Sequence, residues 1–288
     1  MPKIRKAVFP VAGLGTRMLP ATKTIPKEML PVIDKPIIQY AFEEARAAGI
    51  EHIVFVTGRG KSVIEDHFDR AYELDDALAR KDKRAELEAV SAWVPQPGEL
   101  SYTRQQEPLG LGHAVWCARE MVGNEPFAVV LVDDLVVSDT PCLRQMVEAH
   151  AETGGNVVAV EEVPQEHTDR YGVLDPGGDD GRLVEVKGLV EKPAPAAAPS
   201  RLAVIGRYIL LPEVFEHLAL QQTGAGGEIQ LTDAMARMIG RQPFHGLRFE
   251  GRRFDCGARF GYLEATVACA LERDELRSGV REILERYR

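Results

Sequence analysis

The sequence predicts an α/β fold: a Rossmann-like, mixed and mostly parallel central sheet flanked by helices, with a small β-rich part and C-terminal helices. The first observation is a set of apolar, β-branched runs of strand length at residues 6–12, 52–57 and 127–132. The second is helical spacing of apolar residues between them, at 37–48 and 62–74. Strands that alternate with helices favour parallel pairing through right-handed crossovers.

The first half of the chain continues this alternation. Residues 62–74 are expected to form a helix capped by Ser62, with Glu65 as its capping-box partner. Residues 75–90 are helical in pattern and heavily charged, which is typical of a solvated excursion rather than a binding surface. A short strand at 101–105, a helix from 109 to 120 and the strand at 127–132 follow.

The second half is richer in strands. A strand at 156–163 precedes a hairpin formed by 171–174 and 183–190, which turns at 176–181. The remaining expected elements are a strand at 202–211, helices at 213–220 and 228–239, a final strand before Arg253, and one or two amphipathic helices at 261–287. With 288 residues and no internal repeat, we expect a single domain, 1–288.

Composition narrows the classes of partner. The net charge of −9 argues against a nucleic-acid-binding or anionic-membrane surface. Apolar runs are too short for a signal peptide or a membrane span. The four cysteines lack C-x-x-C spacing and are expected to be reduced thiols, which suggests a cytoplasmic protein.

Against this acidic background, the stretch 8–36 is basic. Its apolar strand turns at Gly13 and Gly15, and Arg17, Lys23 and Lys27 follow. A glycine turn after a strand exposes backbone N–H groups, and nearby cations complete a site for phosphate. The stretch therefore predicts a small anionic ligand.

Two common glycine motifs do not fit this stretch or its surroundings. A dinucleotide fingerprint, G-x-G-x-x-G, needs a third glycine where Met18 stands. A phosphate loop ending at Gly60-Lys61-Ser62 would need its first glycine where Phe55 stands.

Acids follow two expected strands. Asp133 and Asp134 end the apolar run 127–132, and Asp255 precedes Cys256 and Gly257. Carboxylates beyond the ends of strands, close to a phosphate site, suit Mg²⁺. Each acid judged alone also fits a helix cap or a turn.

Two further groups have both a functional and a structural interpretation. Lys192 precedes Pro193, which favours an extended backbone, yet by composition it is an ordinary solvent lysine. The amide of Gln105, with Gly110, could recognise a base edge, but the segment also fits a polar strand end and a helix start.

Taken together, these segments resemble the sugar-phosphate nucleotidylyltransferases over nearly the whole chain. Two of the segments resemble the uridylyltransferase branch in particular: Gln105 to Ala114 and Gly227 to Asp233. The segments that carry the resemblance are Ala12-Gly13-Leu14-Gly15-Thr16-Arg17, Pro26-Lys27-Glu28-Met29-Leu30-Pro31, Gln105-Gln106-Glu107-Pro108-Leu109-Gly110-Leu111-Gly112-His113-Ala114, Arg170-Tyr171-Gly172-Val173, Val190-Glu191-Lys192-Pro193 and Gly227-Glu228-Ile229-Gln230-Leu231-Thr232-Asp233.

The resemblance implies a role for each matching residue. Catalysis would fall to Arg17, Lys27 and Lys192. Nucleotide contacts would come from Ala12, Gly13, Gly15, Glu28, Gln105, Gly110 and Asp133. The sugar phosphate would be bound by Tyr171, Gly172, Glu191 and Lys192. Asp133 and Asp255 would hold Mg²⁺, and Asp134 leaves open which acid binds the metal.

The implied reaction is uridylyl transfer from UTP to glucose 1-phosphate, which yields UDP-glucose and pyrophosphate. Residues 1–140 would mainly bind the nucleotide, 141–258 the sugar phosphate, and 259–288 would form C-terminal helices at an oligomer contact. The resemblance favours a homodimer or homotetramer. Alternatives are the same chemistry with dTTP or ATP, and a non-catalytic sugar-nucleotide-binding regulator.

Overall fold

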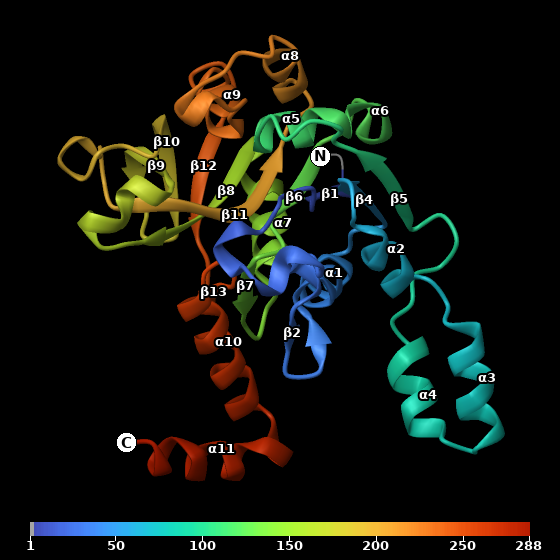
Figure 1. Ribbon diagram of the computed structural model, residues 1–288. Coiled ribbons are helices and arrows are strands. Elements are labelled where there is room, and N and C mark those ends of the chain that lie inside the picture. The colour runs from blue at the N-terminus through green and yellow to red at the C-terminus, as the bar shows by residue number, and fades with distance from the viewer. Residues whose placement is uncertain (1–2) are drawn as a thin grey trace.

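A computed structural model describes residues 3–288, and its centre is a twisted sheet (Figure 1). Within the described residues this sheet has nine strands. In spatial order they are β5 (Leu100–Arg104), β4 (His52–Thr57), β1 (Lys6–Pro10), β6 (Phe127–Val130), β11 (Leu202–Leu210), β8 (Asn156–Glu162), β12 (Phe244–Arg248), β10 (Leu183–Glu191) and β9 (Gly172–Asp179).

The sheet is mixed, as the sequence predicts. The four strands β5, β4, β1 and β6 are parallel neighbours, in agreement with their strand–helix alternation. β11 runs antiparallel to both β6 and β8, and β9 and β10 form the predicted hairpin. Parallel pairing beyond β6 is found between β8 and β12, so parallel strands predominate in the first half of the sheet only.

Helices cover both faces of the sheet. Successive side chains of a strand point to opposite faces, so each strand contributes apolar side chains to a core on either side. In β1, Ala7 and Phe9 enter one core cluster and Val8 enters the other. The first cluster includes residues of α1 (Ile37–Ala47), α2 (Ser62–Phe68), α7 (Cys142–Thr153) and α10 (Arg259–Glu272). The second includes residues of α5 (Leu111–Cys117), α6 (Arg119–Val122), α8 (Val214–Leu218) and α9 (Leu231–Ala236).

Two expectations about helices need correction. The helix predicted at 62–74 ends at Phe68, and its N-cap is Lys61 without a side-chain cap, so the capping box at Ser62 is wrong. Ser62 already has helical backbone, and the Lys61 side chain turns to Glu28 instead. Helix α7 was not predicted from the sequence, although its buried residues Cys142, Leu143, Met146, Ala149 and His150 have helical spacing.

Two parts of the chain project from the body (Figure 1). The charged segment forms a helical hairpin, α3 (Tyr72–Arg80) and α4 (Arg84–Ser91), with no buried residue, which confirms the predicted solvated excursion. At the C-terminus, α10 leads away from the sheet and α11 (Asp274–Arg286) has no buried residue.

Two small sheets complete the fold. β2 (Pro31–Val32) pairs with β3 (Lys35–Pro36). β7 (Asp134–Val137) pairs antiparallel with β13 (Arg252–Asp255), and the register places Asp134 opposite Asp255. This second pairing brings together two acidic positions that lie far apart in the sequence.

Candidate active site

The loop after β1 folds back on itself through a left-handed glycine. Gly15 has φ of 66°, and its carbonyl oxygen accepts a 2.7 Å hydrogen bond from Thr22 Oγ1. A Cβ at Gly15 would lie 3.3 Å from the Cβ of Lys27. Glycine here therefore permits both the backbone turn and the close approach of Lys27. In the same loop Ala12 is half-buried and Gly13 is exposed.

Lys27 reaches the acid that follows β6. Its Nζ donates a 2.6 Å hydrogen bond to Oδ2 of Asp133. Burial alone would raise the pKa of Asp133, but the charge and hydrogen bond of Lys27 outweigh it, so the pKa is lowered. Burial would likewise lower the pKa of Lys27, yet Asp133 and Glu28 raise it. Both groups therefore stay charged at neutral pH.

Arg17 joins this pair to a second acid. Its Nη2 lies 3.9 Å from Oδ2 of Asp133, and its Nη1 lies 3.7 Å from Oδ2 of Asp255. A Cβ at Gly257 would lie 2.5 Å from Oδ2 of Asp133 and 3.0 Å from Oδ1 of Asp255. The two carboxylates thus approach one point, which a side chain at residue 257 would fill.

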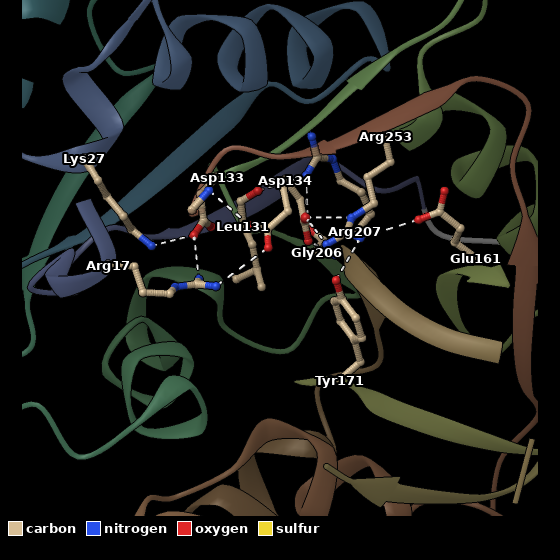
Figure 2. A network of polar contacts seen from close by, with 12 residues as sticks. Arg17, Lys27, Leu131, Asp133, Asp134, Glu161, Tyr171, Gly206, Arg207 and Arg253 are labelled. Atoms are coloured by element: carbon tan, nitrogen blue, oxygen red, sulfur yellow. Dashed lines mark hydrogen bonds and ion pairs between the residues drawn. The ribbon is translucent and has the colours of Figure 1, made fainter. Parts of the chain in front are cut away.

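Asp134 belongs to a different set of contacts from Asp133 (Figure 2). Its Oδ1 accepts a 2.7 Å hydrogen bond from Nε of Arg253, and its Oδ2 accepts a 2.8 Å hydrogen bond from the backbone N–H of Gly206. Burial raises the pKa of Asp134, against the opposing charge of Arg253. The two adjacent acids therefore face different partners.

The segment predicted to recognise the base is held by the later uridylyltransferase-like segment. Nε2 of Gln105 donates a 3.0 Å hydrogen bond to the carbonyl oxygen of Gly110. Gly110 has φ of 110°, and a Cβ there would lie 2.8 Å from the carbonyl oxygen of Ile229. The N–H of Ile229 donates to the carbonyl oxygen of Leu109 over 2.7 Å, and the N–H of Gly112 donates back to Ile229 over 2.8 Å.

The predicted sugar residues lie where β9 begins and β10 ends. A Cβ on the buried Gly172 would lie 3.4 Å from Oε2 of Glu191 and 3.1 Å from Oγ1 of Thr232. Nζ of Lys192 lies 3.1 Å from Oε1 of Glu191. Thr232 belongs to the segment from Gly227 to Asp233, but the sequence predicted no role for it in the site.

The backbone of Lys192 differs from the expectation. Pro193 predicts an extended conformation, but Lys192 has φ of 46°, in the left-handed region. Its N–H donates a 2.9 Å hydrogen bond to the carbonyl oxygen of Tyr171, directly after the Glu191–Gly172 register pair. The tertiary contact at the end of the hairpin overrides the local preference, and such strain is typical of functional positions.

A cavity of about 450 Å³ lies between the acids predicted to bind Mg²⁺ and Tyr171, which is predicted to bind the sugar. Arg170 and Arg253 belong to its lining, although the sequence interpretation gave neither a role. The lining consists of Arg17, Asp133, Asp134, Arg170, Tyr171, Arg253, Asp255 and Ala258. A larger open groove of about 1530 Å³, between α2, the α3–α4 hairpin and Arg273, contains none of the predicted site residues.

Glu28 belongs to the basic loop that follows β1, and its side chain is buried. The residue is 1 % exposed, and its Oε2 accepts a 2.8 Å hydrogen bond from Nζ of Lys61. Burial raises the pKa of Glu28 in spite of the charges of Lys61 and Lys27. In this conformation the carboxylate faces a buried cation, and its contact with a nucleotide stays a prediction.

Comparison with known proteins agrees with this geometry. Residues 6–270 match the family described as "Nucleotidyl transferase". The UTP–glucose-1-phosphate uridylyltransferase of Komagataeibacter xylinus is 57% identical over 256 residues, 89% of this chain and 90% of that protein. The enzyme of the same name from Bacillus subtilis (strain 168) is 50% identical over 285 residues, 99% of this chain and 97% of that protein.

Solved structures give the same result. A UDP-glucose pyrophosphorylase complexed with UDP-glucose is 44% identical, with a TM-score of 0.86 over 94% of this chain and 100% of that one. A UTP-bound enzyme from Acinetobacter baumannii is 41% identical, with a TM-score of 0.90 over 98% of each chain. These similarities span both halves of the sheet and the C-terminal helices, and the chain therefore belongs to the nucleotidyl transferase family.

Proposed function

We propose that this chain transfers the uridylyl group of UTP to glucose 1-phosphate and so forms UDP-glucose and pyrophosphate. The observation that carries the proposal is the cluster of Arg17, Asp133 and Asp255 at one cavity, which Tyr171 also lines. Lys27 joins this cluster through its ion pair with Asp133. The relatives at 50% and 57% identity, which are named for this activity, support the choice of substrates.

The cations of the first loop suit the triphosphate. Arg17 is 62% exposed and lies against both carboxylates, while Lys27 is largely buried and fixed on Asp133. We assign both to the phosphates that depart as pyrophosphate, because positioned cations offset charge that develops on a leaving group. Ala12, Gly13 and Gly15 would border the nucleoside, and Gln105 with Gly110 would bind the base.

The sugar phosphate would bind at the start of β9 and the end of β10. Gly172 and Glu191 are close enough to share a sugar hydroxyl between backbone and carboxylate. Lys192 would bind the phosphate of glucose 1-phosphate, and its left-handed backbone fixes the direction in which the side chain leaves the hairpin. Tyr171 would line the sugar pocket between this hairpin and the acids.

The two acids fit Mg²⁺. Asp133 and Asp255 converge on the space above Gly257, and Mg²⁺ takes few carboxylates together with phosphate oxygens and water. When bound there, the metal would offset negative charge on the phosphate oxygens. The lowered pKa of Asp133 keeps this ligand ionised. Asp134 does not fit the same role, because each of its oxygens already accepts a hydrogen bond from the protein.

The chemistry requires positioning rather than a general base. A phosphate oxygen of glucose 1-phosphate is ionised at neutral pH and can attack the α-phosphorus of UTP in line, so that the bond to pyrophosphate breaks. Lys192 would hold the attacking phosphate, and Arg17 with Lys27 would hold the leaving one. Two polyanions must approach each other, so charge neutralisation supplies most of the rate enhancement.

The test is a matrix of nucleoside triphosphates against sugar 1-phosphates, with pyrophosphate release as the readout. We expect turnover with UTP and glucose 1-phosphate, and a loss of roughly 10-fold or more when a base leaves a buried hydrogen-bonding group unpaired. Faster turnover with dTTP or ATP would replace the nucleotide assignment. Binding of UDP-glucose without turnover of any pair would favour a regulator.

Assembly and location complete the proposal. We propose a homodimer or homotetramer, because α11 has no buried residue and apolar side chains along the C-terminal helices, such as Leu263 and Ile283, are exposed. Light scattering on the purified protein measures the oligomeric state.

The four cysteines form no disulfide in the described residues, which supports the proposed cytoplasmic location. Within residues 3–288, none of the helices has the length and apolar character that a membrane span requires.

A further inference from the structure

A buried ion pair between Arg253 and Asp134 lines the cavity that Tyr171 also lines. Nη2 of Arg253 lies 2.5 Å from Oδ1 of Asp134, and the two side chains are 7% and 11% exposed. The other oxygen of Asp134 is held by the backbone of Gly206. Moving two opposite charges out of water costs free energy, which their attraction repays only when both groups are well hydrogen-bonded. The hydrogen bond from Nε of Arg253 to Oδ1 of Asp134 therefore helps to fix the geometry of this pair.

The same guanidinium contacts Tyr171 (Figure 2). Nη1 of Arg253 lies 3.4 Å from the hydroxyl oxygen of Tyr171 and 3.4 Å from Oε2 of Glu161. The Cζ atom lies 5.1 Å from the centre of the Tyr171 ring, within the range of a cation–π contact. Arg253 therefore contacts both the ring and the hydroxyl of the residue that lines the sugar pocket.

The hydrogen-bond direction is chemically informative. A guanidinium can only donate, so the hydroxyl oxygen of Tyr171 accepts from Arg253. The hydroxyl proton of Tyr171 is then free to be donated to another acceptor. In the cavity the available acceptor would be a hydroxyl oxygen of the bound glucosyl group.

The position of the pair explains why it would act on the substrate. Asp134 follows Asp133 and stands opposite Asp255 in the β7–β13 ladder, and Arg253 lies two residues before Asp255. Tyr171 comes from another part of the fold, directly before β9. Arg253 thus connects the β7–β13 strand pair, which carries Asp255, with Tyr171, which would border the sugar.

We propose that Arg253, fixed by Asp134, is a positioning residue that orients the Tyr171 ring and hydroxyl toward the glucosyl group of the bound sugar phosphate. The inference rests on the proposed function and deepens it, because it names what sets the affinity for the sugar part of the substrate. Asp134 then acts through Arg253 and is not a metal ligand. The pair affects sugar binding and leaves nucleotide binding unchanged.

Calorimetry with UDP-glucose and UDP isolates the sugar part, since the two ligands differ by the glucosyl group. In Arg253→Gln we expect UDP-glucose to bind roughly 10-fold more weakly, the loss of a hydrogen bond to a charged group, while UDP binds within about twofold of wild type. In kinetics, KM for glucose 1-phosphate should rise and KM for UTP should not. Equal weakening of UDP and UDP-glucose, or no weakening, would overturn the proposal.

A double-mutant cycle tests the link to Tyr171. Tyr171→Phe removes only the hydroxyl, and the double variant with Arg253→Gln should bind UDP-glucose no more weakly than Arg253→Gln alone. Losses that multiply would show that the two residues act independently and would refute positioning. Because Arg253→Gln leaves a buried carboxylate, Asp134→Asn/Arg253→Gln provides a neutral pair that should fold and show the same selective loss.

Two controls separate positioning from general stability. Arg248→Gln removes another arginine–carboxylate pair, to Asp179, outside the cavity and should leave both affinities unchanged. Arg253→Lys keeps a charge beside Asp134 but cannot contact three partners as the guanidinium does. It should recover thermal stability without recovering UDP-glucose affinity, and recovery of both would contradict the proposal. Absence of turnover by the wild type would count against the reaction itself, since these binding measurements need no turnover.

Discussion

The Nζ atom of Lys27 lies 2.6 Å from Oδ2 of Asp133, although the two residues are 106 positions apart in the sequence. This contact ties the basic loop after β1 to the acid that follows β6. It holds a cation and a carboxylate charged in a partly buried place, with side chains 20% and 19% exposed. The loop that we propose to bind phosphate and the acid that we propose to bind Mg²⁺ are thereby held together.

Lys27→Met should lower kcat/KM by roughly 10²-fold or more, as expected for the loss of one donor that stabilises transition-state charge. Steady-state pyrophosphate release measures it. Lys35→Met is the matched control, because Lys35 also makes a 2.6 Å ion pair, to Glu43, and should leave the rate unchanged. A loss of less than a few-fold in Lys27→Met would remove this lysine from the mechanism.

Gly257→Ala should impair activity far more than stability. Its Cβ would lie 2.5 Å from Oδ2 of Asp133 and 2.7 Å from Nη2 of Arg17, and both are ends of side chains that can move aside. Their displacement should lower kcat/KM by about 10- to 100-fold, because catalytic groups tolerate little misplacement.

The control for Gly257→Ala is Gly279→Ala in α11, where a Cβ meets no atom within 4 Å. That variant should keep full activity. Thermal unfolding of both variants, measured beside the rates, distinguishes a displaced site from a destabilised fold. A Gly257→Ala enzyme with wild-type rates would show that the two carboxylates need not approach one point.

Arg207→Met should destabilise the fold by about 3–5 kcal/mol, because it leaves the carboxylate of Glu44 buried and unpaired. Arg207 is 0% exposed, donates to both oxygens of Glu44, and donates a 3.0 Å hydrogen bond to the carbonyl oxygen of Leu131. Urea unfolding gives the free energy. The double variant Glu44→Leu/Arg207→Met should regain much of the loss, and failure to regain any would mean that the Leu131 contact dominates.

Asp179→Asn should show a stability deficit that disappears in acid. The bidentate contact with Arg248, aided by the Gly181 N–H, lowers the pKa of Asp179 to about 2. A lowered folded-state pKa means that the stabilisation is complete above the unfolded value of about 3.9 and is lost as the pH falls through the folded value.

The measurement for Asp179→Asn is the difference in Tm from wild type between about pH 6 and pH 2.5. We expect roughly 1–3 °C near neutrality, as for an exposed pair, and a decline below about pH 4. Arg248→Gln removes the same contact from the other side and should give the same profile. A difference that stays constant to the lowest pH would contradict the shifted pKa.

Local patterns were sufficient for most of the elements. Alternation of apolar strands and helices predicted β1, α1, β4 and the β9–β10 hairpin, since burial of a periodic face is a local property of the chain. The same patterns missed α7, although its buried residues have helical spacing, and misplaced the cap of α2. The cap was misplaced because Lys61 pairs with Glu28, a tertiary contact that local spacing does not encode.

The sequence by itself determined which residue types are available: a glycine turn with Arg17 and Lys27, acids at strand ends, and a lysine before proline at 192. Only the tertiary structure decided how they combine. It placed Lys27 on Asp133, turned Asp134 to Arg253, buried Glu28 against Lys61 and gave Lys192 a left-handed backbone. The physical reason is that charge pairing and close approach depend on distances across the fold, which sheet register sets and residue spacing does not encode.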